Sequence, residues 1–136
     1  TAKDMAIYMK MLLQRGTYNG KQYFKPSTVE EFIRIQYLEN NNRRGLGFDK
    51  PLIGNDNLSL KEAYPAPQVS AESFGHSGFT GTFVWADPKY DLVFIFLSNR
   101  VYPSRTHSNI YNLNIRPKLQ QVFYTSLNSE EKLINN

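Results

Sequence analysis

A run of six consecutive hydrophobic residues at positions 92–97 limits the possible folds more than any other segment. A strand that faces water on one side alternates apolar and polar residues, whereas a strand covered on both sides does not. The run therefore predicts a central strand with helices over both faces of its sheet. An Asp-Pro turn around Pro88 joins it to a second strand expected at 82–85, so the two strands should be antiparallel. We expect an α/β chain of the α+β type, with an antiparallel sheet flanked by helices.

Helical spacing of apolar residues predicts three helices, at 1–15, 27–38 and 109–127. Thr1 and Asp4 are placed to form a capping box at the start of the first helix. In the last helix, the side chains expected to face the core are Leu119, Val122 and Phe123.

The segments between the helices carry turn and strand signals. An Asn19-Gly20 pair between short β-prone stretches predicts a hairpin, and residues 45–48 predict a short strand. Residues 51–72 are rich in turn residues and predict a long loop, of the kind that is usually functional or disordered. The sheet core is expected at 73–100. Because 136 residues is the size of one domain, residues 1–136 are expected to form a single unit.

Composition excludes several functions. The chain has no cysteine, which rules out disulfides, thiolate metal ligands and a cysteine nucleophile. His76 and His107 are the only histidines, and no carboxylates stand at ligand spacing around them, so no metal and no cofactor is expected. The net charge of +4 is spread along the chain without a basic run, which disfavours nucleic acid as a partner. No stretch is long and apolar enough to predict a transmembrane segment.

Residues 74–82, Phe-Gly-His-Ser-Gly-Phe-Thr-Gly-Thr, combine glycines, hydroxyls and a histidine ahead of a strand. From the residues alone, a bulged edge strand and a functional site are both open. A nucleophile elbow at Ser77 would need a glycine where Phe79 stands, and a helix after it. A triad of Ser77, His107 and an aspartate is also conceivable, because triads are defined by geometry and not by sequence order.

The sequence His76-Ser77-Gly78, followed by Phe79-Thr80-Gly81-Thr82, resembles the HxG variant of the K-T-G motif of class C β-lactamases, DD-peptidases and related esterases. The Asp-Pro turn, the strand after it, the segment at 45–48 and the first helix resemble the same family, so the likeness covers nearly the whole chain. It implies a partial β-lactamase/transpeptidase-like fold and a small-molecule or peptide substrate. It also implies a periplasmic or cell-surface location.

The resemblance assigns roles to residues of this motif. His76 takes the place of the lysine that lines the site, and Ser77 that of the hydroxyl that binds a substrate carboxylate or carbonyl. Gly78 allows close approach of the backbone, and the amide of Phe79 is one of two oxyanion-hole donors. The remaining expected substrate contacts are Thr80, Arg100 and Arg105. Taken alone, the two arginines are better explained as solvated surface residues.

Two motifs of the family are absent upstream of His76: the S-x-x-K that carries the nucleophile and the Y-x-N that carries its partner. Ser129 and Lys132 match S-x-x-K in the polar tail, but the glutamates beside them disfavour the neutral lysine that such a motif requires, so the match is attributed to chance. We therefore expect the C-terminal part of a longer serine hydrolase, inactive alone, whose missing N-terminal half completes the site. The isolated sheet is expected to expose an edge through which the chain forms a homodimer.

Two other functions remain open. One is a non-catalytic β-lactamase-like binding or accessory module, appended for example to a glycoside hydrolase. The other is a small self-sufficient binding domain in which 74–82 is only a bulged strand. The presence of S-x-x-K and Y-x-N upstream of this chain would separate a hydrolase from both.

Overall fold

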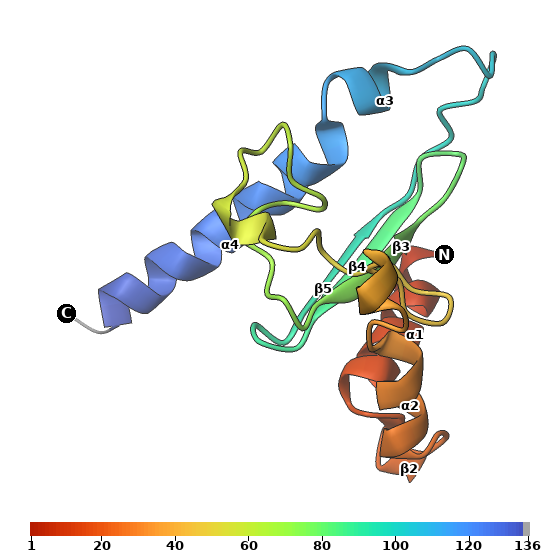
Figure 1. Cartoon of the computed structure of the whole chain (residues 1–136), viewed down its shortest axis with the longest axis vertical. Helices are drawn as coiled ribbons and strands as arrows, with labels where there is room; N and C mark the ends of the chain where they lie inside the picture. The colour runs from red at the N-terminus through yellow and green to blue at the C-terminus, as the bar shows by residue number, and fades with distance from the viewer. Residues whose placement is uncertain (135–136) are drawn as a thin grey trace.

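The structure, a computed structural model, describes the backbone of residues 1–134 and the side chains of residues 1–127. Its centre is an antiparallel sheet in the order β3-β4-β5, formed by Phe74–Ser77, Phe83–Asp87 and Leu92–Phe96. Helix α1 lies on one side of this sheet, and the loop at 51–72 with helix α4 lies on the other (Figure 1). Helices and an antiparallel sheet are thus layered as the sequence predicts, and the expected fold class is confirmed.

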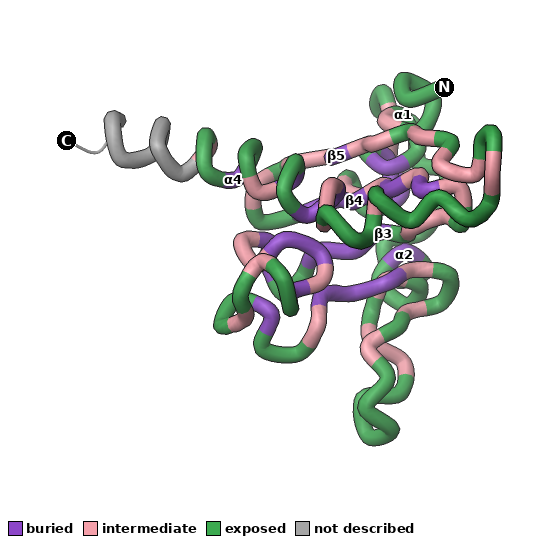
Figure 2. Tube along the Cα trace, turned by 90° about the horizontal axis from the view of Figure 1, so that it is seen from above, coloured by how far each residue is buried: buried purple, intermediate pink, exposed green. Residues whose placement is uncertain are grey.

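The two faces of the sheet carry two separate hydrophobic clusters, because successive residues of a strand point to opposite faces. Val84 and Ala86 of β4 pack with Met9 and Leu12 of α1. Phe83, Trp85 and Phe94 face the other way. There they meet Ala66 and Val69 of the loop and Tyr124 of α4. Figure 2 shows the buried segments concentrated along β3, β4 and the adjoining loop.

Helix α1 spans Ala2–Leu13 and begins with the capping box predicted for Thr1 and Asp4. The hairpin that follows consists of β1, Thr17–Tyr18, and β2, Lys21–Gln22. Asn19 and Gly20 both have positive φ, 48° and 74°, as the favoured two-residue hairpin turn requires. The local signals at this end of the chain therefore predicted the local structure.

Two expected elements in the next segment are wrong. The helix expected at 27–38 is α2, Pro26–Ile33, and it ends where Arg34 takes an extended conformation (φ −69°, ψ 155°). The strand expected at 45–48 is a turn, closed by a hydrogen bond of 3.0 Å from the amide of Gly45 to the carbonyl of Phe48. Asp49, the next residue, makes a β-bridge with Gly75 of β3. Two short 3-10 turns, Leu38–Asn40 and Asn55–Asn57, complete this half of the chain.

The closing helix expected at 109–127 is divided into α3, Asn109–Asn112, and α4, Ile115–Ile134. The break is at Asn114, which has φ 53° and whose Nδ2 donates to the carbonyl of Leu60 at 2.5 Å. The inward face of α4 is also not the expected one. Leu119, Val122 and Phe123 are 40%, 60% and 52% exposed. The side chains that α4 buries in the described part are Arg116, Pro117, Gln120 and Tyr124.

The apolar strand β5 is covered on both faces by the two clusters, but it is not central. It forms an edge of the sheet, and only Phe94 among its residues is fully buried. An unpaired edge of this kind offers backbone donors and acceptors to another strand. Within the described range, no helix combines the length and apolarity needed to cross a bilayer.

A buried carboxylate ties the loop at 51–72 and α4 to the end of β4. Asp87 is completely buried. Its Oδ1 accepts from Ser70 Oγ at 2.6 Å and from the Lys89 amide at 3.1 Å. Its Oδ2 accepts from the Ser70 amide at 2.8 Å and from Tyr124 Oη at 2.8 Å. One side chain of β4 thus fixes the covering layer on the side away from α1.

Candidate functional site

The pairing of β3 determines which of its amides are free. The amide of Gly78 donates to Thr82 across the hairpin at 2.8 Å, so even-numbered residues of this strand turn their backbone groups toward β4. Odd-numbered residues turn theirs to the outer edge, because backbone groups alternate along a strand. There Gly75 pairs with Asp49 through hydrogen bonds of 2.7 and 3.0 Å. The amide of Ser77 continues this edge beyond the bridge, and Phe79 follows in the turn after β3.

The turn after β3 holds the Phe79 amide in place. The amide of Gly81 donates to the Gly78 carbonyl at 2.9 Å, and Gly81 has φ +94°. This is a three-residue hairpin loop closed by a left-handed glycine. A Cβ at Gly78 would lie 2.3 Å from Thr82 Oγ1, so a larger residue there would force the Thr82 side chain to move. Within the part of the chain that the structure describes, the Phe79 amide donates no hydrogen bond.

A network of polar side chains lies beside this edge. Tyr64, from the long loop, places its Oη 3.2 Å from Ser77 Oγ and 3.2 Å from Asp49 Oδ2. His76 Nδ1 lies 3.9 Å from the same carboxylate oxygen, and the imidazole is half exposed. Asp49 itself is 2% exposed. The structure therefore brings Ser77 and His76 together with two residues that the sequence analysis did not select, Tyr64 and Asp49.

Cations surround this network. Arg44 Nε lies 2.8 Å from Asp49 Oδ1, and the guanidinium of Arg43 lies 4.7 Å from the centre of the Tyr64 ring. Burial raises the pKa of Tyr64 above its usual value, so its hydroxyl is neutral at physiological pH. Lys50, the neighbour of Asp49, is buried with its Nζ donating to the Glu72 carbonyl at 2.6 Å, and burial lowers its pKa to about 8.

The other predicted substrate contacts form a separate group around the exposed ring of Phe79. The Arg100 guanidinium lies 4.5 Å from that ring, and that of Arg105 lies 5.4 Å from it. Arg100 Nε donates to the Phe79 carbonyl at 2.8 Å, and its Nη1 donates to the carbonyls of Arg105 and His107 at 3.2 and 2.9 Å. The carbonyl of Thr80 accepts from the Arg100 amide at 2.9 Å. Arg100 thus holds the loop at 99–108 against the hairpin.

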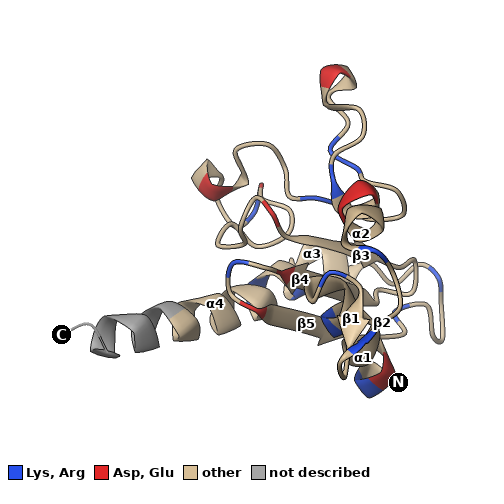
Figure 3. Cartoon of the chain, turned by 90° about the horizontal axis from the view of Figure 1, so that it is seen from below, with Lys and Arg blue, Asp and Glu red and all other residues tan. Residues whose placement is uncertain are grey.

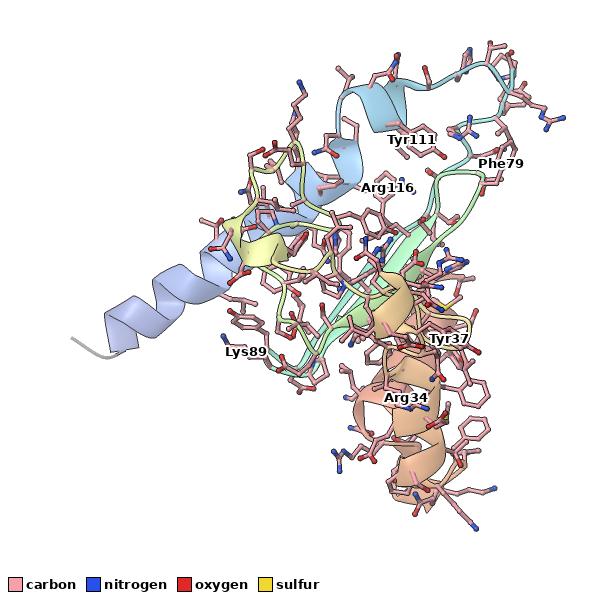
Figure 4. All side chains as sticks on the ribbon, viewed as in Figure 1. Arg34, Tyr37, Phe79, Lys89, Tyr111 and Arg116 are labelled. Carbon is pink, nitrogen blue, oxygen red and sulfur yellow. The ribbon has the colours of Figure 1, made fainter. Side chains whose placement is uncertain are left out.

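A small pocket of about 220 Å³ lies beside Tyr64. It is lined by Tyr64, Phe83 and Tyr111 and by the start of α4. Arg116 enters it with 8% exposure, and its Nη1 has no hydrogen-bond partner within the described residues. Figure 4 shows Arg116 between Tyr111 and the sheet, at the end where Phe79 lies. No local motif signals this residue, and only its burial beside aromatic rings distinguishes it.

Several alternatives lose their structural basis. A strand and not a helix follows Ser77, contrary to what a nucleophile elbow needs. His107 lies in the loop held by Arg100, while the described hydrogen-bond partner of the Ser77 side chain is Tyr64.

Among the residues with described side chains, no group of three or more histidine or acidic residues could hold a metal ion. Figure 3 shows basic and acidic residues interspersed along the chain. The side chains of Ser129 and Lys132 lie outside the described residues.

Comparison with known proteins gives consistent results. A family model described as Beta-lactamase matches residues 1–115. The chain is 29% identical over 116 residues to proteins of Salmonella enteritidis PT4 and Salmonella newport, both named "Putative D-alanyl-D-alanine carboxypeptidase". These matches cover 85% of this chain but only 24% of the relatives, so the chain spans about a quarter of their length.

A solved structure has the same fold. The crystal structure of a beta-lactamase from Mycobacterium bovis superposes with a TM-score of 0.63 at 22% sequence identity. The superposition covers 93% of this chain and 44% of the mycobacterial one. The layers described above therefore recur as part of a larger protein.

Proposed function

The chain belongs to the beta-lactamase family, and from this premise we propose that it forms the sheet-side wall of the acyl-transfer site of a longer serine hydrolase. The observation that carries the proposal is the outer edge of β3. Two residues beyond Ser77, the Phe79 amide donates no hydrogen bond among the described residues, and the half-exposed His76 imidazole lies 3.9 Å from Asp49 Oδ2. Such an amide, aimed at a developing oxyanion, contributes about 3 kcal/mol to the transition state.

The edge also suits an extended peptide substrate. Asp49 already pairs with Gly75 as a neighbouring strand would. An acyl-peptide laid along Ser77 and Phe79 would continue that pairing by β-augmentation. The buried guanidinium of Arg116 in the adjoining pocket contacts the rings of Phe83 and Tyr111, and its Nη1 has no hydrogen-bond partner among the described residues. A buried cation with a free donor favours a substrate with a carboxylate. A D-alanyl peptide, ester or β-lactam has these features.

The nucleophile and its base come from outside this chain in our proposal. This agrees with relatives that are much longer than this chain, since the matches cover only 24% of them. We place the whole protein in the periplasm or at the cell surface, the location that the resemblance of its His76-Ser77-Gly78 motif to the family implies. The competing proposal is a module that binds such peptides without cleaving them, and an acylation assay distinguishes the two.

The first test is chemical labelling. This chain, incubated with a fluorophosphonate or a penicillin, should show no adduct in intact-mass spectra, whereas the longer protein should be labelled stoichiometrically. An adduct on Ser77 of the chain alone would overturn the assignment of the nucleophile to another segment. An unlabelled longer protein that still binds the peptide would support the binding module instead.

A pair of substitutions then isolates the Phe79 amide. Phe79→Pro removes the N–H at the second position of the turn, where proline is tolerated, and Phe79→Ala keeps the N–H but removes the ring. In the longer protein, we expect the acylation rate to fall about 10²–10³-fold with proline and less than about 10-fold with alanine. Equal losses in the two variants would contradict a role for this amide.

A further inference from the structure

Ser77 is held by a chain of two hydrogen bonds that begins at a buried carboxylate. Asp49 is fixed to the strand of Ser77 by its backbone pairing with Gly75, two residues earlier, and by Arg44 at 2.8 Å. Tyr64 Oη lies between the two residues, 3.2 Å from Asp49 Oδ2 and 3.2 Å from Ser77 Oγ. The Tyr64 ring packs edge-on against Trp85 and Phe83, with centroids 5.9 and 6.4 Å apart. Ring packing and the contact with Asp49 therefore position the Tyr64 hydroxyl.

The number of protons decides the direction of these bonds. A carboxylate only accepts hydrogen bonds, and a phenol or an alcohol has one proton to donate. The single Tyr64 proton goes to Asp49, because a hydrogen bond to a charged acceptor is the stronger one. The Tyr64 oxygen is then left to accept, so the Ser77 proton points to Tyr64.

We propose that Tyr64, oriented by Asp49, is a positioning residue that makes Ser77 Oγ a hydrogen-bond acceptor toward the substrate. The proposal rests on the function proposed above and adds the chemistry of the substrate group that meets Ser77. That group is a donor, such as a peptide N–H. A carboxylate would meet the lone pairs of Ser77 and belongs elsewhere, beside Arg116. The resemblance to the family implied the opposite role, in which the Ser77 hydroxyl donates a hydrogen bond to a substrate carboxylate or carbonyl.

Ionisation of Tyr64 tests whether Ser77 donates to its oxygen, without any need for catalysis. If Ser77 donates to Tyr64, it stabilises the tyrosinate, and Ser77→Ala must raise the pKa of Tyr64 further above its usual value. If Ser77 makes no donor hydrogen bond to the Tyr64 oxygen, the same substitution leaves that pKa unchanged. The pKa is measured on this chain by NMR titration of the ¹³Cζ-labelled tyrosines, with Tyr64→Phe assigning the signal.

Ser98→Ala serves as the matched control, since its hydroxyl donates to the Thr80 carbonyl and does not contact Tyr64. We expect a rise in the Tyr64 pKa for Ser77→Ala and no change for Ser98→Ala. A fall for Ser77→Ala, or no change, overturns the proposal. Because the readout is a titration, it stands even if the chain proves to be a binding module.

Substrate analogues test the consequence in the longer protein. A peptide whose N–H facing Ser77 is methylated should lose about fivefold in kcat/KM, the effect of one hydrogen bond, through KM more than kcat. Ser77→Ala should remove this discrimination, and Tyr64→Phe should weaken it by freeing the serine hydroxyl to rotate. Equal kcat/KM of the wild-type protein for the methylated and unmethylated peptides would refute the acceptor role of Ser77. A protein that is not acylated at all would refute the proposed function and leave the titration result intact.

Discussion

The hydroxyl of Tyr124 offers a sharp measure of how strongly α4 is fastened to the sheet. Tyr124 and Asp87 are 1% and 0% exposed, and the hydrogen bond between them is 2.8 Å long. A hydrogen bond to a buried charge contributes about 1.5–3 kcal/mol. Tyr124→Phe removes this bond and little volume, while Asp87 keeps its bonds to Ser70 and Lys89. We expect the free energy of unfolding to fall by about 2 kcal/mol.

The matched control is Tyr90→Phe. The Tyr90 ring packs edge-on against Tyr124 with centroids 5.2 Å apart, and no hydrogen bond of its hydroxyl is found among the described residues. Its loss should change stability by less than about 0.5 kcal/mol. Urea unfolding followed by fluorescence reports on both variants, because Trp85 is the only tryptophan and lies in the same cluster. In heat, Tyr124→Phe should lower Tm by roughly 7 °C.

The dependence on pH provides a second signature of this bond. Burial and the neighbouring Asp87 raise the pKa of Tyr124. The unfolded tyrosine ionises near pH 10 and the folded one does not, so its stabilising contribution is complete below pH 10 and declines as pH rises above it. Tyr124→Phe should show a smaller decline, because Tyr64, whose pKa is also raised by burial, still contributes. The reasoning would be refuted if Tyr124→Phe and Tyr90→Phe lowered the free energy of unfolding equally, or if Tyr124→Phe lowered it by less than about 0.5 kcal/mol.

Two further predictions concern charge and assembly. Burial lowers the pKa of Lys50 from 10.5 to about 8. Between pH 8 and pH 10.5, the unfolded chain therefore binds more protons than the folded chain. The free energy of unfolding should rise by about 2 kcal/mol from pH 7.5 to 9.5. Urea unfolding at both pH values should show this rise in wild type and not in Lys50→Met, and equal slopes would contradict it. The open edge of β5 and the exposed Val122 and Phe123 predict self-association by light scattering. Leu97→Lys, at an exposed position beside β5, should reduce it, and a monomeric wild type would contradict the prediction.

Elements governed by local signals were predictable from the sequence. The capping box of Thr1 and Asp4 and the Asn19-Gly20 turn both form as expected, because each depends on residues within one turn of the chain. The apolar run at β5 correctly indicated coverage of both faces. Its place at an edge was not predictable, because the position of a strand in a sheet depends on which segments pair with it.

Elements governed by distant contacts were not predictable. Apolar spacing placed Leu119 and Val122 inward on the last helix, but the chain buries Gln120, whose Oε1 accepts from the Ala66 amide at 3.1 Å. A buried polar residue of this kind is stabilised by a partner 54 positions away, which periodicity does not reveal. Helix α2 likewise ends at Ile33 although its pattern continues to Tyr37.

The residues of the candidate site also differ in whether local or distant contacts place them, and so in whether the sequence could predict them. His76, Ser77 and Phe79 are contiguous and form a recognisable motif, so the sequence could nominate them. A single β-bridge brings Asp49 to the site, and the long loop brings Tyr64 there. Neither residue is part of a sequence motif. The one available signal was the length of the loop at 51–72, because loops of that size commonly carry functional residues.

The connectivity of the sheet predicts the order in which the chain folds. β3, β4 and β5 are joined by loops at 78–82 and 88–91, so the pairings among these three strands each close a short stretch of chain. The bonds from Gln120 to Ala66 and from Asn114 to Leu60 each close 54 residues. Because closing a longer loop costs more entropy, we expect the meander to form first and the docking of α4 to be the late step. Substitutions on α4 would then alter the unfolding rate, and those in the β3–β4 hairpin the folding rate.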